Sequence, residues 1–417
     1  MRHAFKAALA ASLLCILSVP AAFAGDFGRD DDHGGRNDQS IQLGPRPFYL
    51  VDGMDPGPLK SKLMRCMNGP FHRTSFSISH RGAPLQFPEH TKEGYVAAAR
   101  MGAGIIECDV TFTKDGQLVC RHDECDLHTT TNIVNTPLNA SCTTPWSGPN
   151  SNPRCCTSDI TLAQFRTLKP KMDASTPSAP TAAGFLAGTA SWRTDLYNPR
   201  ATLLTLREHI AMNRGLGVKH TPELKAGNPT RIAQVFGSQE AYAQAMIDEY
   251  KRAHVDARDV YAQSFNLADV IYWVTHEPAF GRQAVYLDDV DPSVGIPPLT
   301  PAELQDLRRQ GVRIFAPPIP ALLAVDSNDQ IVPSQYAKDI KAAGLKIISW
   351  SFERADLRNG AKGAGFYAAF DPDGRAIKKD SDMYLELDAL AQDVGVIGLF
   401  SDWPATVSYY ASCMGLD

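Results

Sequence analysis

The stretch GIIECDVTFTKDGQLVCRHD, residues 104–123, is the most informative part of the chain about its architecture. It opens with an apolar, β-branched run, 104–110, of the kind found in buried strands. A Lys-Asp-Gly turn then leads into a second short run, 117–123, which we expect to fold back as a hairpin. Because side chains two apart on a strand share a face, Glu107 and Asp109 should point the same way.

The pattern of that first run recurs along the chain. The apolar runs are 76–78, 104–110, 218–224, 260–265, 284–287, 312–316, 345–350 and 396–401. Segments of helical character lie between them, most clearly 91–101, 203–213, 238–254, 301–310 and 333–343. Eight repeats of a strand followed by a helix predict an α/β fold of the TIM type, which is a closed (β/α)8 barrel. A doubly wound open sheet is the alternative, which is disfavoured because no Gly-x-Gly-x-x-Gly follows the first strand.

The alternation stops after the hairpin, over residues 125–200. Pieces rich in Cys, Pro, Ser and Ala surround one expected helix at 161–168. The stretch offers little apolar material for a core of its own. We therefore expect a disulfide-rich, decorated loop after the second strand of the barrel, and not a separate small domain.

The composition excludes several classes of protein. With 44% hydrophobic and 21% charged residues over 417 positions, the chain can bury a large core, which excludes wholesale disorder, collagen-like structure and coiled coil. Lys and Arg total 41 against 46 Asp and Glu, so the formal charge of −5 gives no reason to expect nucleic acid as a partner.

The first residues predict export. Residues 1–24 combine two cations, an apolar run and an Ala-x-Ala ending, the pattern of a cleaved signal peptide. Residues 25–46 are polar and rich in Gly and Asp, as expected of a flexible leader, and 47–417 would form the barrel domain. No later segment approaches the ~20 apolar residues of a membrane span. We therefore expect a periplasmic or secreted protein without a transmembrane segment after signal removal.

The cysteines agree with export. Eight remain after the predicted signal, namely Cys66, Cys108, Cys120, Cys125, Cys142, Cys155, Cys156 and Cys413. An even number without any Cys-x-x-C pair favours disulfides over metal thiolates. The sequence does not fix their pairing, although a bridge between Cys66 and Cys413 would tie the two ends of the exported chain together.

Candidate catalytic groups stand at the ends of the predicted strands. Glu223 and Lys225 share a face on the strand that follows Glu107 and Asp109 along the sheet. Three carboxylates that converge at the mouth of a barrel would repel each other without a divalent cation, and oxygen-only ligands suit Ca²⁺ or Mg²⁺ better than zinc.

Two histidines and an arginine are expected at the same mouth. His80 and Arg81 end the first strand, and His122 ends the hairpin. Barrel enzymes place catalytic groups at these strand ends. Two histidines can act as proton donor and acceptor, and an arginine fork suits a phosphate.

These residues carry a family resemblance. The blocks His80-Arg81-Gly82, Pro88-Glu89-His90-Thr91 and IIECDVTFTKDGQLVCRHD resemble the opening signature of the glycerophosphodiester phosphodiesterase family. The likeness continues through Pro222-Glu223-Leu224-Lys225, Gln263-Ser264-Phe265, Ile348-Ser349-Trp350-Ser351 and LFSDWPATV. It extends over about residues 75–407.

The resemblance implies a TIM-type barrel with one divalent cation that hydrolyses a glycerophosphodiester, a deacylated phospholipid head group, to glycerol 3-phosphate and an alcohol. The implied metal ligands are Glu107, Asp109 and Glu223, and the implied acid and base are His80 and His122. Arg81 and Lys225 would hold the phosphate, Glu89 would orient its neighbours, and Trp350 would face the glycerol carbons. Export slightly favours Ca²⁺ over Mg²⁺, because calcium is abundant outside the cytoplasm.

The chain departs from the family pattern in two places. His128 stands where the family usually has an arginine before its Thr-Thr pair, which puts a phosphate or structural contact there in doubt. The Cys-rich piece 132–156 and the Pro/Ala-rich piece 171–198 exceed the compact pattern. Both lie beside the predicted mouth, where they would either narrow substrate access or brace an exported protein.

Three alternative functions remain open on the same fold. One is cleavage of intact lipid, as in phospholipase D-like enzymes of the sphingomyelinase D type, which would require an exposed apolar rim. The second is cleavage of polymers of the teichoic-acid type. The third is a binding protein without catalysis, since a fold does not fix a function. The sequence leaves the head-group preference and the oligomeric state undetermined.

Overall fold

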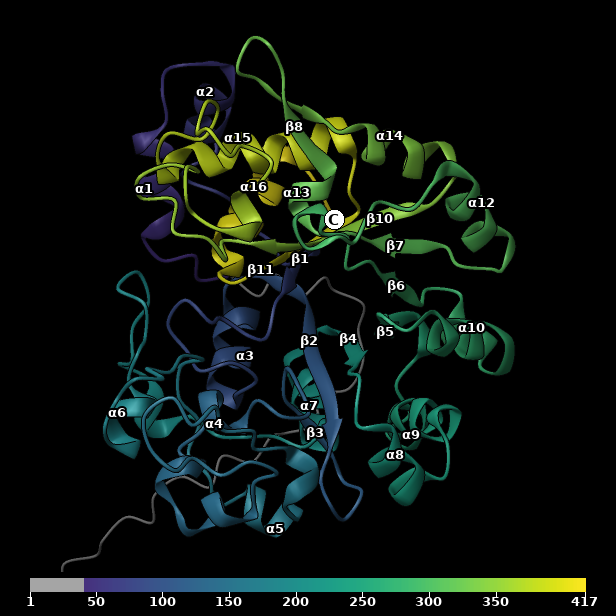
Figure 1. Cartoon of the computed structure of the whole chain (residues 1–417). Helices are drawn as coiled ribbons and strands as arrows, with labels where there is room; N and C mark the ends of the chain where they lie inside the picture. The colour runs from purple at the N-terminus through teal and green to yellow at the C-terminus, as the bar shows by residue number, and fades with distance from the viewer. Residues whose placement is uncertain (1–40) are drawn as a thin grey trace, which may run out of the picture. The chain divides into compact units, whose positions relative to one another are not determined.

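The computed structural model describes residues 41–417. Eight parallel strands form a barrel in the spatial order β1 (Thr74–Ser79), β2 (Ala103–Phe112), β4 (Lys219–Leu224), β5 (Gln263–Ser264), β6 (Val285–Leu287), β7 (Ile314–Ala316), β10 (Lys346–Phe352) and β11 (Gly398–Ser401). The barrel closes because β1 pairs with both β2 and β11. All eight predicted strands and the TIM-type fold are confirmed, and the open-sheet alternative is wrong (Figure 1).

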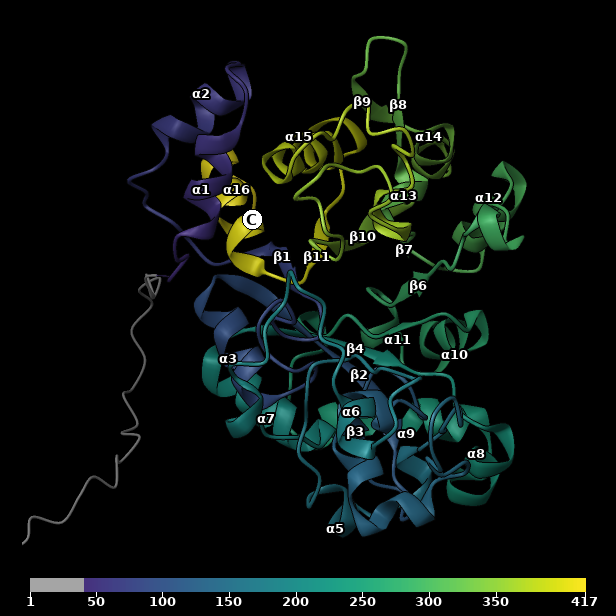
Figure 2. The ribbon, with the colours of Figure 1, turned by 60° about the vertical axis from the view of Figure 1, so that its left-hand side comes forward.

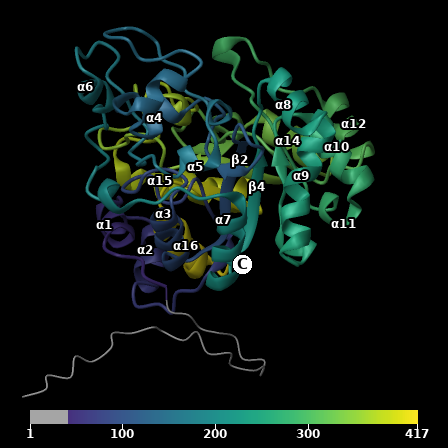
Figure 3. The ribbon, with the colours of Figure 1, turned by 90° about the horizontal axis from the view of Figure 1, so that it is seen from below.

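Helices surround the barrel, and at least one follows each strand before the next strand begins. They are α3 (Lys92–Arg100), α7 (Leu206–Leu216), α8 (Pro229–Phe236), α9 (Gln239–Arg252), α10 (Leu267–His276), α11 (Pro278–Gly281), α12 (Pro301–Arg309), α13 (Ile319–Leu322), α14 (Gln335–Ala342), α15 (Met383–Asp388) and α16 (Pro404–Met414). Figure 3 shows α8 to α12 grouped on one side of β2 and β4. The five helical segments predicted from the sequence correspond to α3, α7, α9, α12 and α14.

The sequence signals at α7 show why these helices begin and end where they do. The Thr205 side chain accepts a hydrogen bond from the main chain of Glu208, and the Glu208 carboxylate accepts one from the main chain of Thr205, which is a capping box. The helix ends at Gly217 with φ +64°, a left-handed conformation that glycine adopts at low cost. This stop places the start of β4 directly after the helix.

The two ends of the described chain meet. Helices α1 (Arg46–Gly53) and α2 (Pro58–Arg65) pack against α16 (Figure 2). The bridge between Cys66 and Cys413, suggested above from position alone, is present. The predicted signal peptide and residues 25–40 of the predicted leader lie outside the described residues, whereas Leu43 is already buried and α1 begins at Arg46.

The predicted hairpin and insertion are confirmed after β2. Strand β3 (Leu118–Cys120) pairs antiparallel with β2, and a disulfide joins Cys108 to Cys120 across the pair. The insertion carries α4 (Leu127–Thr130), α5 (Leu162–Phe165) and α6 (Ala182–Leu186), which lie in the lower left part of Figure 1. Two further disulfides, Cys125–Cys156 and Cys142–Cys155, hold it. A separate hairpin, β8 (Leu323–Val325) and β9 (Ile331–Pro333), follows α13.

One expectation about the insertion was wrong. It has an apolar cluster of its own, which includes Ile133, Ile160, Phe165 and Phe185. These residues are too far apart along the chain to show any period, so the sequence gives no sign that they converge. The cluster also takes in Val119 of β3, and the insertion is therefore packed onto the barrel wall.

The barrel lumen is filled from the strands. A second apolar cluster consists of buried strand residues, among them Ile78, Ile105, Ile314 and Phe400. Layers of branched side chains are the usual filling of such barrels. The lumen is therefore a packed core, and polar side chains have room only where the strands end.

Candidate active site

Three carboxylates converge at the carboxyl ends of β2 and β4. Asp109 lies opposite Glu223 in the parallel register of the two strands, and Glu107 lies two residues earlier on β2. One oxygen atom of each carboxylate lies within 4.8 Å of the others, and all three side chains are buried. The convergence of Glu107, Asp109 and Glu223 predicted from the sequence is present.

The crowding of these acids has an electrostatic cost. Burial, together with Asp109 and Glu223, raises the pKa of Glu107 well above its usual value. Burial also raises the pKa of Glu223 to about 7, although Lys225 beside it acts in the opposite direction. Buried like charges of this kind are held together where a cation neutralises them.

The donor set fits a hard divalent cation. Asp109 Oδ1 is buried and has no hydrogen-bond partner among residues 41–417, which leaves it available as a ligand. Its other oxygen, Oδ2, accepts a bond from His90 Nε2 at 2.9 Å. Three carboxylates without a nitrogen or sulfur donor suit Ca²⁺ or Mg²⁺.

The two histidines lie at the same mouth. His80 follows β1 directly, and its Nδ1 donates to Asp402 Oδ1 at 2.6 Å. That bond leaves Nε2, which lies 3.2 Å from Ser351 Oγ, as the proton-accepting nitrogen. Burial and Arg81 lower the pKa of His80 to about 4. Burial, Arg81 and Lys225 likewise lower the pKa of His122.

The cations are tied to the acids. The main-chain N–H of Arg81 donates to Glu107 Oε2 at 2.8 Å, and its guanidinium donates to Glu89 Oε1 at 3.0 Å. Lys225 Nζ lies 2.6 Å from Glu223 Oε1. The close turn after Arg81 requires glycine, because Gly82 has φ +101° and a Cβ there would lie 3.1 Å from the backbone of Gly94.

A cavity of about 240 Å³ collects most of the predicted residues. Those that line it are His80, Arg81, Glu107, His122, Glu223, Lys225 and Trp350. Asp109 and Glu89 are buried beside it and make the contacts given above. His128 lies on α4 and is not among the described residues that line this cavity.

Aromatic side chains form one wall. Trp350 is half-buried, and its Nε1 donates to Ala316 O at 2.8 Å. Its ring centroid lies 5.8 Å from that of Phe265 and 6.2 Å from that of Tyr367. This wall offers apolar contact to the carbon atoms of a bound ligand.

Sequence reasoning missed several side chains at the mouth. Asp402 follows the last strand directly, so the strand-end rule applied to β11 would have found it. Gln263, whose Nε2 donates to Glu107 Oε1 at 3.1 Å, lies in a quoted motif but received no role. Arg354 lies two residues after β10, as Arg81 does after β1, so the strand-end rule could have pointed to it, whereas Tyr367 lies far from any strand end and carries no such signal.

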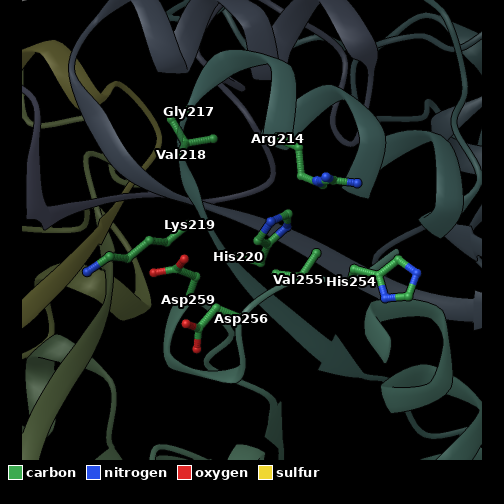
Figure 4. Close-up of a pocket in the computed structure, with 9 residues that line it drawn as sticks. All are labelled: Arg214, Gly217, Val218, Lys219, His220, His254, Val255, Asp256 and Asp259. Atoms are coloured by element: carbon green, nitrogen blue, oxygen red, sulfur yellow. The ribbon is translucent and has the colours of Figure 1, made fainter. Parts of the chain in front are cut away.

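A second cavity of about 420 Å³ lies at the opposite end of β4. Figure 4 shows the side chains that line it, among them Arg214, Lys219, His220, His254 and Asp256. Lys219 and His220 are the first two residues of the strand whose other end carries Glu223.

The chain is similar to proteins of one family. The family model described as "Glycerophosphoryl diester phosphodiesterase family" matches residues 80–406. A protein of Arthroderma benhamiae named "Extracellular protein" is 42% identical over 59% of this chain and 100% of its own length. "Glycerophosphodiester phosphodiesterase GDPD6" of Arabidopsis thaliana is 22% identical over 80% of this chain and 85% of its own length.

A solved structure shares the fold. The crystal structure of a Silicibacter pomeroyi protein, described there as a candidate glycerophosphoryl diester phosphodiesterase, superposes with a TM-score of 0.54. The two sequences are 18% identical, and the match covers 83% of this chain and 95% of that one. At this identity the likeness concerns the barrel and not its substrate.

Proposed function

The chain belongs to the glycerophosphoryl diester phosphodiesterase family, and we propose that it is an exported, metal-dependent enzyme that releases glycerol 3-phosphate from deacylated phospholipid head groups. Family membership makes it a phosphoric diester hydrolase. The observation that carries the proposal is the lining of one 240 Å³ cavity by two histidines, two cations and two of three clustered carboxylates.

The carboxylates would hold the cation. In this proposal Glu107, Asp109 and Glu223 bind one Ca²⁺ or Mg²⁺, with Ca²⁺ slightly favoured outside the cell. When bound, the cation would act as a Lewis acid on the phosphoryl oxygen. Lys225 and Arg81 would bind the phosphate, which carries negative charge throughout the reaction.

The histidines would move the protons. His80 Nε2 is set to accept a proton because Nδ1 already donates to Asp402. It would take the proton of the glycerol hydroxyl next to the phosphate as that oxygen bonds to phosphorus. The negative phosphate of a bound diester would favour the protonated imidazole of His122, against the effect of Arg81 and Lys225. His122 would then give a proton to the alcohol oxygen as its bond to phosphorus breaks, and water would open the cyclic phosphate.

The two halves of the substrate would lie in adjoining spaces. The aromatic wall with Trp350 would receive the glycerol carbons. A further cavity of about 430 Å³ shares Glu223, Lys225 and Phe265 with the catalytic one, and this space would receive the leaving alcohol. A polar diester that spans both cavities fits this arrangement.

Two observations support export. The described chain has four disulfides, which persist in oxidising compartments. The Arthroderma relative is named as an extracellular protein. We propose a periplasmic or secreted location on these two grounds. Within residues 41–417, none of the helices has the length and apolar character needed to cross a membrane.

The test is release of glycerol 3-phosphate from glycerophosphocholine. The full chain without its predicted signal is assayed as purified, after treatment with EDTA, and after restoration of Ca²⁺ or Mg²⁺. We expect EDTA to abolish release and one of the two cations to restore it. Release that is unaffected by EDTA would overturn metal dependence. No release under any condition would overturn the proposed substrate and favour intact lipid or a polymer as substrate, or a binding role.

A further inference from the structure

A single guanidinium binds three carboxylates beside the catalytic cavity. Arg354 follows β10, and its NH1 donates to Asp402 Oδ2 at 3.0 Å. Its NH2 donates to Glu89 Oε1 at 2.7 Å and to Asp173 Oδ2 at 3.2 Å. The Arg354 side chain is 16% exposed, and those of Asp402 and Glu89 are 1% exposed.

Two of these carboxylates hold residues of the proposed catalytic set. Asp402 accepts a hydrogen bond from His80 Nδ1 at 2.6 Å, and Glu89 accepts one from Arg81 at 3.0 Å. Each carboxylate therefore lies between Arg354 and one side chain that faces the cavity. A shift of Arg354 would move the base and the phosphate-binding cation together.

The third carboxylate comes from the insertion. Asp173 pairs with Arg193 of the same insertion, and Arg193 Nε donates to the main-chain oxygen of Pro84 at 2.7 Å. Pro84 lies in the loop that follows His80 and Arg81. The insertion thus contacts the site twice, once through Arg354 and once through this loop.

The network pairs carboxylates with guanidinium groups. Three carboxylates, Asp173, Glu89 and Asp402, face three guanidinium groups, Arg81, Arg193 and Arg354. Burial opposes the charge on Glu89, yet Arg81 and Arg354 hold its pKa well below the usual value. Because a buried ion is costly unless it is paired, removal of Arg354 would weaken two buried carboxylates' pairing and leave Asp402 with His80 and Glu89 with Arg81.

We propose that Arg354 is a positioning residue that fixes His80 and Arg81 through Asp402 and Glu89, and that Asp173 of the insertion holds Arg354 in place. The insertion is therefore a functional part of the site and not only a brace. This inference rests on the roles given to His80 and Arg81 under the proposed function.

The first test compares Arg354→Ala with Arg358→Ala. Arg358 is an exposed matched control that also reaches the insertion, through Ser191 Oγ at 3.1 Å, but pairs with Asp356. We expect kcat to fall about 10- to 100-fold in Arg354→Ala, as for other outer partners of a site, and to stay within about twofold in Arg358→Ala. The kcat of Asp173→Asn should lie between those of Arg354→Ala and Arg358→Ala.

Rescue separates positioning from folding. Added guanidinium at millimolar concentration should restore part of the kcat of Arg354→Ala and leave Arg358→Ala unchanged, since the small cation can occupy the vacated place. A loss of kcat that follows the loss of thermal stability and resists rescue would overturn the proposal. So would a kcat for Arg354→Ala within about twofold of the wild type.

A readout without turnover keeps this inference distinct from the proposed function. The Nδ1 proton of His80, held by Asp402, should give a downfield proton NMR signal, assigned by its absence in His80→Gln. We expect the signal to persist in Arg358→Ala and to be lost to solvent exchange in Arg354→Ala. Persistence in Arg354→Ala would overturn the positioning role, whatever the enzyme's activity proves to be.

Discussion

The two ends of strand β4 carry similar residue types and differ in how those residues meet. The carboxyl end contributes Glu223 to the proposed catalytic cavity, and the amino end contributes Lys219 and His220 to the cavity of Figure 4. Each cavity has histidine, a cation and carboxylates. Composition alone would not tell them apart.

The two cavities differ in how close their charged groups lie to one another. At the carboxyl end, three acid oxygens lie within 4.8 Å of each other and one has no donor among the described residues. At the opposite end, Asp256 is exposed and pairs with Arg258, and Arg214 donates to a main-chain oxygen at 2.8 Å. In Figure 4, Lys219 and His254 lie on opposite sides of the cavity. Buried like charges that crowd one another indicate a functional site, whereas exposed charges that are paired one by one do not.

The largest difference between the two ends should appear in catalysis. His80→Ala and His122→Ala should each lower kcat by about 10²- to 10⁴-fold, the usual contribution of a general acid or base. The kcat of His220→Gln, at the opposite end, should stay within about twofold of the wild-type value. Turnover of glycerophosphocholine at saturating substrate, with circular dichroism as a check on folding, measures both. Full activity in both His80→Ala and His122→Ala would remove the proposed roles.

Substitutions at the two ends of β4 should also differ in their effect on cation affinity, by a smaller factor than for kcat. Glu223→Gln removes one ligand and should weaken Ca²⁺ or Mg²⁺ binding by up to about 100-fold, since a neutral amide replaces a carboxylate. Asp256→Asn is the matched control at the other end and should leave the affinity unchanged. Isothermal titration calorimetry without substrate measures both. Equal affinity of Glu223→Gln and the wild type would place the cation elsewhere.

Acid should destabilise the protein partly through the amino end of β4. Burial, with Arg214 nearby, lowers the pKa of His220 from 6.5 to about 4. The unfolded state therefore binds more protons than the folded state between pH 6.5 and 4, so the free energy of unfolding falls as the pH falls through that window. His220→Gln should remove up to about 3 kcal/mol of this loss by pH 4.

Urea unfolding of the wild type and His220→Gln at pH 7, 5.5 and 4 checks this prediction. The free energy of unfolding of the wild type should fall more steeply between pH 7 and 4 than that of His220→Gln. Parallel curves would show that His220 does not titrate differently in the folded state.

The smallest effect is expected for Lys219→Ala. Because Lys219 is only partly buried at the start of β4, its ammonium group can stay hydrated. Its loss should change stability by less than about 0.5 kcal/mol and leave kcat unaltered. Thermal unfolding and the turnover assay together measure this. A loss of activity here would mean that the amino end of β4 acts on the site, contrary to the comparison above.

The barrel and most of the candidate site follow from local signals in the sequence. Alternating apolar runs and helix stops each involve a few neighbouring residues, and the end of a strand is a position that can be counted. Glu107, Asp109 and Glu223 could therefore be placed together from the chain alone. Asp402 was within reach of the same rule, because it follows β11 directly.

The surroundings of those residues depend instead on tertiary packing. The pairing of Cys125 with Cys156 and of Cys142 with Cys155 depends on how the insertion folds, since several pairings are compatible with the same chain. The meeting of Arg354 with Asp173, 181 positions apart, has no period and no motif. Side chains brought together by packing between distant segments leave no local pattern, because their distance depends on every element between them.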